Sequence, residues 1–86
     1  MLQTIEITLK DKVYKIDWAI SEHFEELKEK TFMLSFVSAE QIEKIKDLSV
    51  TAKILLSAVS GAVIQHLIDK GLQIDEIFRS GKFVIR

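Results

Sequence analysis

The chain has 86 residues, of which 48% are hydrophobic and 29% charged, a composition typical of one folded domain spanning residues 1–86 and not of a disordered segment. Twelve Lys and Arg against thirteen Asp and Glu leave a net charge of −1, which favours neither a nucleic acid nor an acidic membrane as the partner. The absence of cysteine excludes a disulfide framework, a thiolate metal site and a cysteine nucleophile.

The N-terminal residues alternate in the manner of a half-buried β-hairpin. In the segment 2–9, Ile5, Ile7 and Leu9 fall on one side of a strand, with mostly polar residues on the other. The β-branched and aromatic segment 13–18 is predicted to be the partner strand. The charged break at 10–12 has no Asn-Gly or Asp-Gly, so the turn type is not specified.

A change of period after Ala19 predicts an amphipathic helix over about 20–30. Ile20, Phe24 and Leu27 recur at i, i+4 and i+7, and Ser21 or Asp17 could cap the start of this helix. The apolar segment 31–37 that follows is either a third strand or a buried loop.

A capping box formed by Ser38 and Gln41 predicts the start of another helix. The residues of this helix expected to face inward share a helical spacing: Ile42, Ile45 and Leu48. The pattern leaves open whether 39–48 and 51–70 form one helix or two.

A second helical segment is expected to run to Lys70, with Ser49 or Thr51 as its cap and Gly71 just beyond its end. The next segment, 73–78, is either a helical turn capped by Asp75 or a strand that turns at 79–82 into 83–86. The fold expected is therefore α+β. It combines an N-terminal hairpin, two to three helices with one long buried helix at about 50–70, and a short C-terminal strand or wing.

The segment 54–68 is the most informative part of the chain. Its fifteen residues carry no Asp, Glu, Lys or Arg and are apolar or small around nearly the whole helix, which predicts burial on all sides. A membrane span needs about 20 apolar residues, so this run is too short to cross a membrane and no membrane partner is expected. Either this helix is the core of a monomer, or one of its faces pairs with a partner, most simply a second copy. A lipid-facing role is the third and least favoured alternative. The residues expected near that contact are Leu55, Val59, Gly61, Ala62, Val63 and His66.

Chemistry-bearing motifs are not found in the sequence. The two histidines, His23 and His66, form no His-Glu-x-x-His pattern, no serine lies in a Gly-x-Ser-x-Gly elbow, and the three glycines are too scattered for a phosphate-binding loop. We therefore expect no enzymatic activity, no metal and no cofactor.

The C-terminal third resembles the latter half of a winged helix-turn-helix domain. The matching features are Ala58-Val59-Ser60 and Leu67 in a helix, Gly71-Leu72 after it, and a hairpin wing over 74–85. The resemblance implies, as the alternative function, a DNA-binding regulator. The basic residues that it would use for nucleic-acid contacts are Lys53, Lys70, Arg79, Lys82 and Arg86.

The function that the sequence favours is a non-enzymatic interaction or assembly module that self-associates through the 54–68 helix. A third class, a small inhibitor or assembly chaperone of a larger protein, fits the same size and neutrality. The first six residues carry neither a basic region nor an apolar run typical of a secretion signal, so a cytoplasmic location is expected.

Overall fold

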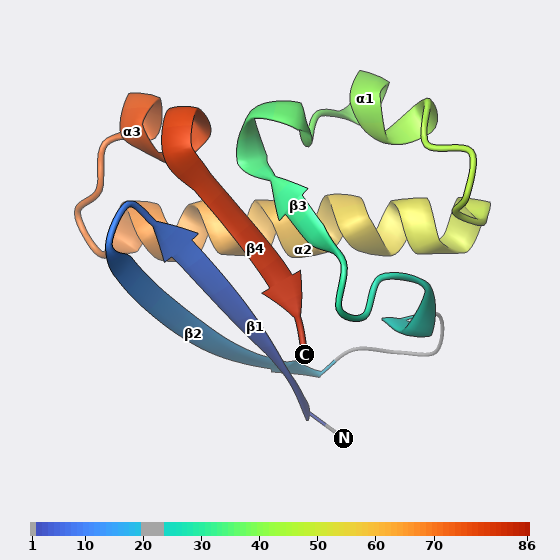
Figure 1. Cartoon of the computed structure of the whole chain (residues 1–86), viewed down its shortest axis with the longest axis horizontal. Helices are drawn as coiled ribbons and strands as arrows, with labels where there is room; N and C mark the ends of the chain where they lie inside the picture. Colours follow the sequence, from blue (N-terminus) through green and yellow to red (C-terminus); the bar gives the residue numbers. More distant parts are fainter. Residues whose placement is uncertain (1, 20–23) are drawn as a thin grey trace.

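The computed structural model describes residues 2–19 and 24–86 and consists of two layers (Figure 1). A four-stranded antiparallel sheet has the strand order β2-β1-β4-β3, and one long helix, α2 (Val50–Asp69), crosses one of its faces. The α+β prediction, with an N-terminal hairpin, a long helix and a C-terminal strand, is confirmed.

The predicted hairpin consists of β1 (Leu2–Leu9) and β2 (Lys12–Ala19). The two strands are joined by Lys10 and Asp11, and Lys10 has a φ of 55°. A positive φ in a two-residue loop is typical of the tight hairpin turns whose twist matches that of the flanking strands. The predicted alternation holds along β1, where the residues on the core side are Gln3, Ile5, Ile7 and Leu9.

The C-terminal strand β4 (Gly81–Ile85) lies in the interior of the sheet, between β1 and β3 (Thr31–Met33). The segment 31–37, which the sequence left open, divides into β3 and the 3-10 turn η2 (Leu34–Phe36). The rings of Phe32 and Phe83 pack across β3 and β4 with centroids 5.5 Å apart. The two ends of the chain therefore build the same sheet, although they are far apart in sequence.

The helix predicted over 20–30 is wrong in the part that the structure describes. Residues 24–26 form only the 3-10 turn η1 (Phe24–Glu26). Glu29, with a φ of 66°, then donates its backbone N–H to the Ile85 carbonyl at 2.8 Å. This hydrogen bond places Glu29 beside the end of β4, just before β3 begins. The contact overrides the helical periodicity, which the like-charged pair Glu25 and Glu29 supports poorly.

The caps proposed for that helix are not supported by the described residues. Asp17 lies in β2, where its carboxylate accepts a hydrogen bond from the Thr4 hydroxyl at 3.0 Å. Ser21 and Ile20 lie outside the described residues.

The segments 39–48 and 51–70 belong to two separate helices, α1 (Ala39–Glu43) and α2. In α1 the hydroxyl of Ser38 accepts from the Gln41 N–H at 3.3 Å, as the capping box predicts. Helix α2 begins at Ser49, whose hydroxyl accepts from the Ala52 N–H at 3.1 Å. The Glu26 carboxylate in turn accepts from the Ser49 N–H and O–H at 2.9 and 2.8 Å, so a cap supported from a distant turn separates the two helices.

The end of α2 is the glycine-terminated motif that the sequence predicts. Gly71 has a φ of 88° and donates to the Ile68 carbonyl, and Leu72 donates to that of Leu67. Of the two alternatives for 73–78, the helical one is observed as α3 (Ile74–Ser80). Asp75 lies in its first turn and is not its N-cap, which is Gln73.

The core lies between α2 and the sheet. Five residues of α2 have no exposed surface: Ala52, Leu56, Val59, Val63 and Leu67. They belong to one cluster with the inward residues of β1 and β4, such as Ile5 and Phe83, and with Leu34 and Ile77 from the shorter elements. Full burial of each large apolar side chain contributes about 1.5–3 kcal/mol, so this layer supplies most of the stability of the fold.

Candidate interaction surface on the long helix

The outward side of α2 is exposed and apolar. Val50 is 74% exposed and Ile54 67% exposed, and Ser57, Ala58 and Gly61 are also exposed. The predicted long helix is confirmed, but its burial is one-sided, because only one face packs on the sheet. An exposed helix face of this length normally carries charged side chains; here it has none between Lys53 and Asp69.

The apolar and small residues of this face follow a heptad spacing. Successive steps of 4, 3, 4, 3 and 4 residues connect the members of what we name the outer stripe: Val50, Ile54, Ser57, Gly61, Ile64 and Ile68. Ile64 and Ile68 are half-buried at its C-terminal end, whereas its first four members are exposed. Such a spacing on one helix forms the seam along which a second helix can pack.

Gly61 lies in the middle of the outer stripe and is not required by the chain's own structure. A Cβ built at this position meets no atom within 4 Å, and the backbone is ordinary helix. Glycine inside a helix costs about 0.8–1 kcal/mol relative to alanine. A glycine that the fold does not need, at the centre of an apolar stripe, is the feature expected where another chain approaches closely.

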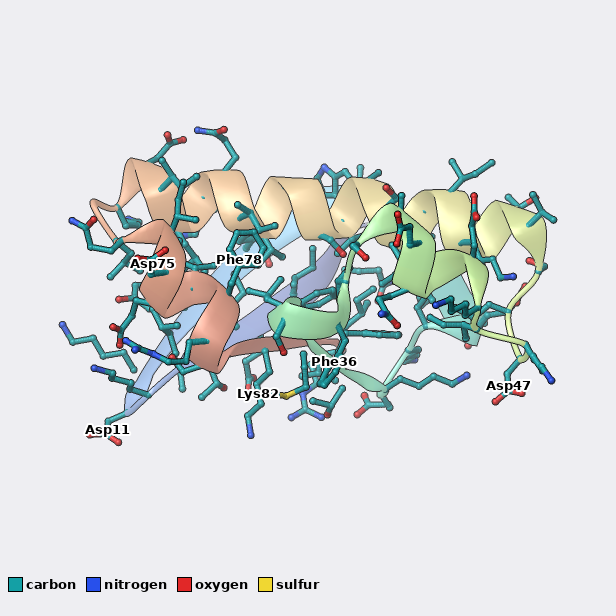
Figure 2. All side chains as sticks on the ribbon, turned by 90° about the horizontal axis from the view of Figure 1, so that it is seen from above. Asp11, Phe36, Asp47, Asp75, Phe78 and Lys82 are labelled. Atoms are coloured by element: carbon teal, nitrogen blue, oxygen red, sulfur yellow. The ribbon has the colours of Figure 1, made fainter. Side chains whose placement is uncertain are left out.

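A shallow groove continues the outer stripe toward α1. It has a volume of about 360 Å³ and lies between the two helices, which Figure 2 shows side by side along the first half of α2. Its lining includes Val50 and Ile54 from the stripe and Ile42 from α1. The Lys53 ammonium donates to the Glu43 carbonyl at 3.0 Å and so holds the two helices together at the groove.

The residues predicted near a contact are divided between the two faces of α2. Gly61 is exposed, and Leu55, Ala62 and His66 are half-buried beside it. Val59 and Val63 have no exposed surface and belong to the chain's own core, so a contact on this folded chain does not include them. Val50, Ile54 and Ser57 are not among the residues predicted near a contact, although the heptad spacing around Gly61 is a signal for them in the sequence.

The basic residues singled out in the sequence are distributed over several elements. Lys53 is in α2 and Lys70 caps its end; Arg79 is in α3, Lys82 in β4, and Arg86 follows β4. Arg86 contacts Glu29 at 2.7 Å and Glu6 at 3.7 Å, and these pairs raise the pKa of its guanidinium.

Glu76 in α3 contacts two cations. Lys10 lies 2.6 Å and Arg79 3.2 Å from its carboxylate, so α3 is tied to the tip of the hairpin. The hydrogen bond from Lys10 has the largest effect in holding the pKa of Glu76 below its usual range. Arg79 is thus engaged with an acid on its own helix.

Within residues 2–19 and 24–86, no three His, Asp or Glu side chains lie close enough to hold a metal ion, and His23 is outside these ranges. By length and composition alone, α2 is the one described helix that could cross a membrane. The core helix of a soluble domain passes the same test, and one face of α2 packs on the sheet.

Comparisons of the chain with family models, with curated proteins and with solved structures find no match. The outer stripe is therefore interpreted from its own shape and chemistry.

Proposed function

We propose that the protein is a non-enzymatic assembly module in which two copies pair through the outer stripe of α2. The observation that carries the proposal is Gly61, a helix glycine with no structural role in the chain, at the centre of an uncharged exposed face. Continuous apolar surface of this kind on a small domain is typical of an interface.

The outer stripe suits a second copy because it is nearly symmetric about Gly61. Ile54 lies seven residues before this glycine and Ile68 seven residues after it. Two helices that cross in opposite directions at Gly61 therefore bring Ile54 of one copy near Ile68 of the other. A contact with two-fold symmetry requires self-complementarity of this kind, and the opposed helix dipoles favour the antiparallel direction.

The outer stripe follows a helix that runs nearly the full length of the molecule. A helix of 20 residues is about 30 Å long, which is close to the 32 Å long axis of the molecule. The groove beside α1 extends the apolar surface, because Ala39 of α1 lines it together with Val50 and Ile54. Because Gly61 has no side chain, the two helix backbones can approach closely at this point. Val50 and Ile54 provide apolar area at the more exposed end of the stripe.

The first experiment is absolute mass by light scattering on a sizing column, at several loading concentrations. We expect at least twice the chain mass of 9.9 kDa, stable on dilution. Ile54→Glu places a charge in the seam and should lower the mass. Ile74→Glu is the matched control, because Ile74 is also an exposed isoleucine, at 52%, but lies on α3.

Gly61→Leu is a second variant for the same measurement. A Cβ at this position meets no atom of the chain within 4 Å, and the leucine side chain would separate two helices that cross here, so the mass should fall while the fold is retained. A wild-type protein that is monomeric at every concentration contradicts the proposal. So does an unchanged mass and stability in Ile54→Glu and Gly61→Leu.

A further inference from the structure

The strand β2 (Lys12–Ala19) forms a long free edge of the sheet. It pairs with β1 on one side, and no strand among residues 2–19 and 24–86 pairs with its other side. The opposite edge strand, β3, is only three residues long, whereas β2 has eight. An edge of this length without proline offers a row of backbone donors and acceptors to an incoming strand.

The direction of the free backbone groups follows from one hydrogen bond. The Thr4 carbonyl accepts from the Arg86 N–H at 2.9 Å, so the even residues of β1 point their peptide groups toward β4. The odd residues of β1 therefore bond to β2, in pairs such as Ile5 with Ile16. It follows that the odd residues of β2 direct their N–H and C=O groups outward: Val13, Lys15, Asp17 and Ala19.

The side chains of β2 are complementary to those of a second, antiparallel β2. Lys15 and Asp17 are exposed on the same face of the strand. When two copies meet with Ile16 opposite Ile16, each Lys15 faces Asp17 of the other copy, and these are the residues whose backbone groups point outward. On the core side, the same register places Tyr14 opposite Trp18 twice, and all three core-side residues are half-buried.

We propose that a second copy of the chain adds antiparallel to β2 in this register, so that the two four-stranded sheets become one continuous sheet. Opposite charges and aromatic pairs directly across strands stabilise such pairing, and like charges oppose it. Lysine at an edge strand generally discourages pairing. Here Asp17 of the second copy compensates that lysine, which makes the edge selective for its own sequence.

This contact is independent of the outer stripe, which lies on the side of α2 that faces away from the sheet. A chain with two self-complementary contacts assembles beyond the dimer, into a closed tetramer or a longer array. Loss of either contact alone should leave dimers, and loss of both should leave monomers.

The test is a charge exchange, measured by light scattering across a concentration series in the Ile54→Glu protein. Lys15→Glu or Asp17→Lys alone places two like-charged pairs across the edge and should weaken dimerisation roughly tenfold or more. The double variant Lys15→Glu/Asp17→Lys restores both opposite-charge pairs and should dimerise like its parent. An equimolar mixture of the two single variants should also form dimers, because each supplies the charges that the other lacks.

The double variant controls for folding. It lacks the hydrogen bond from Thr4 to Asp17, as Asp17→Lys does, and it places a new carboxylate opposite Glu6 on β1, as Lys15→Glu does. Restored association therefore comes from contacts between copies. Single variants that dimerise like the parent, a mixture that stays monomeric, or a parent that is monomeric at every concentration would each overturn the proposal. If Ile54→Glu keeps the wild-type mass, the α2 proposal fails, and the charge series still tests the edge.

Discussion

The two faces of α2 are both uncharged, and only one of them is explained by the chain itself. The inner face places residues such as Leu56 and Val63 in the core, with no exposed surface. The outer face presents Ile54 and Gly61 to solvent, although a solvated helix face is usually charged. The difference teaches that apolar composition alone does not show what a helix face contacts. The structure assigns the inner face to the sheet, and the contact of the outer face with a second copy is our proposal.

The largest effect expected from this comparison is on the stability of the fold. Leu56→Ala removes a fully buried side chain and leaves a cavity, so it should lower the free energy of unfolding by about 2–5 kcal/mol. Ile54→Ala, on the outer face, should change the stability of the single chain by less than about 0.5 kcal/mol.

Urea denaturation of both variants measures the two values, either in a Gly61→Leu/Lys15→Glu background, where both proposed contacts are disrupted, or at a dilution at which light scattering shows a monomer. Comparable losses for Leu56→Ala and Ile54→Ala in a monomeric sample would mean that the chain packs both faces of α2, which would remove the distinction between them.

The same comparison applies to two glycines that lie within regular elements, Gly61 in α2 and Gly81 in β4. Gly81 joins α3 directly to β4, and a Cβ there would lie 2.5 Å from the Ile77 carbonyl and 2.7 Å from the Leu34 side chain. Gly81→Ala must therefore displace backbone, and we expect a loss of about 1–3 kcal/mol in the free energy of unfolding, measured by thermal or urea denaturation. A tolerated alanine at this position would mean that α3 can shift away from β4.

Local signals in the sequence were sufficient for the elements that local hydrogen bonds define. The alternation around Ile5 and Ile7, the Ser38 cap and the Gly71 terminus were all predicted and are all present. The Ser38 cap and the Gly71 terminus bond to neighbours within a few positions, so they need no tertiary information. The alternation around Ile5 and Ile7 is visible in the sequence because only one face of the strand is buried.

Elements that depend on distant contacts could not be predicted in this way. Helical spacing through Phe24 and Leu27 was overridden because Glu29 bonds to the Ile85 carbonyl, more than fifty residues away. The faces of α2 were confused for a related reason. A helix that is apolar all round has no periodic signal to show which side packs on the sheet, so Val59 and Val63 were placed at the contact with a partner. The heptad steps through Ile54 and Gly61 are the sequence signal for the outer stripe. They identify it as the outward side of α2 only once the structure shows which side packs on the sheet.

The sharpest test of the comparison is a small effect that has opposite signs for the stability of the single chain and for its association. Gly61→Ala adds one methyl group to open space on α2 and removes the helix cost of glycine. It should stabilise the single chain by about 0.5–1 kcal/mol. At the crossing point of two copies, the same methyl group would hold the helices apart and weaken the α2 contact. The stability is measured in the Ile54→Glu/Lys15→Glu background, where both proposed contacts are disrupted and association does not contribute to it. The association is measured in the otherwise native chain. A more stable chain that associates less tightly supports close approach at Gly61. A more stable chain of unchanged mass and dissociation constant would show that this glycine is as dispensable to the assembly as it is to the fold.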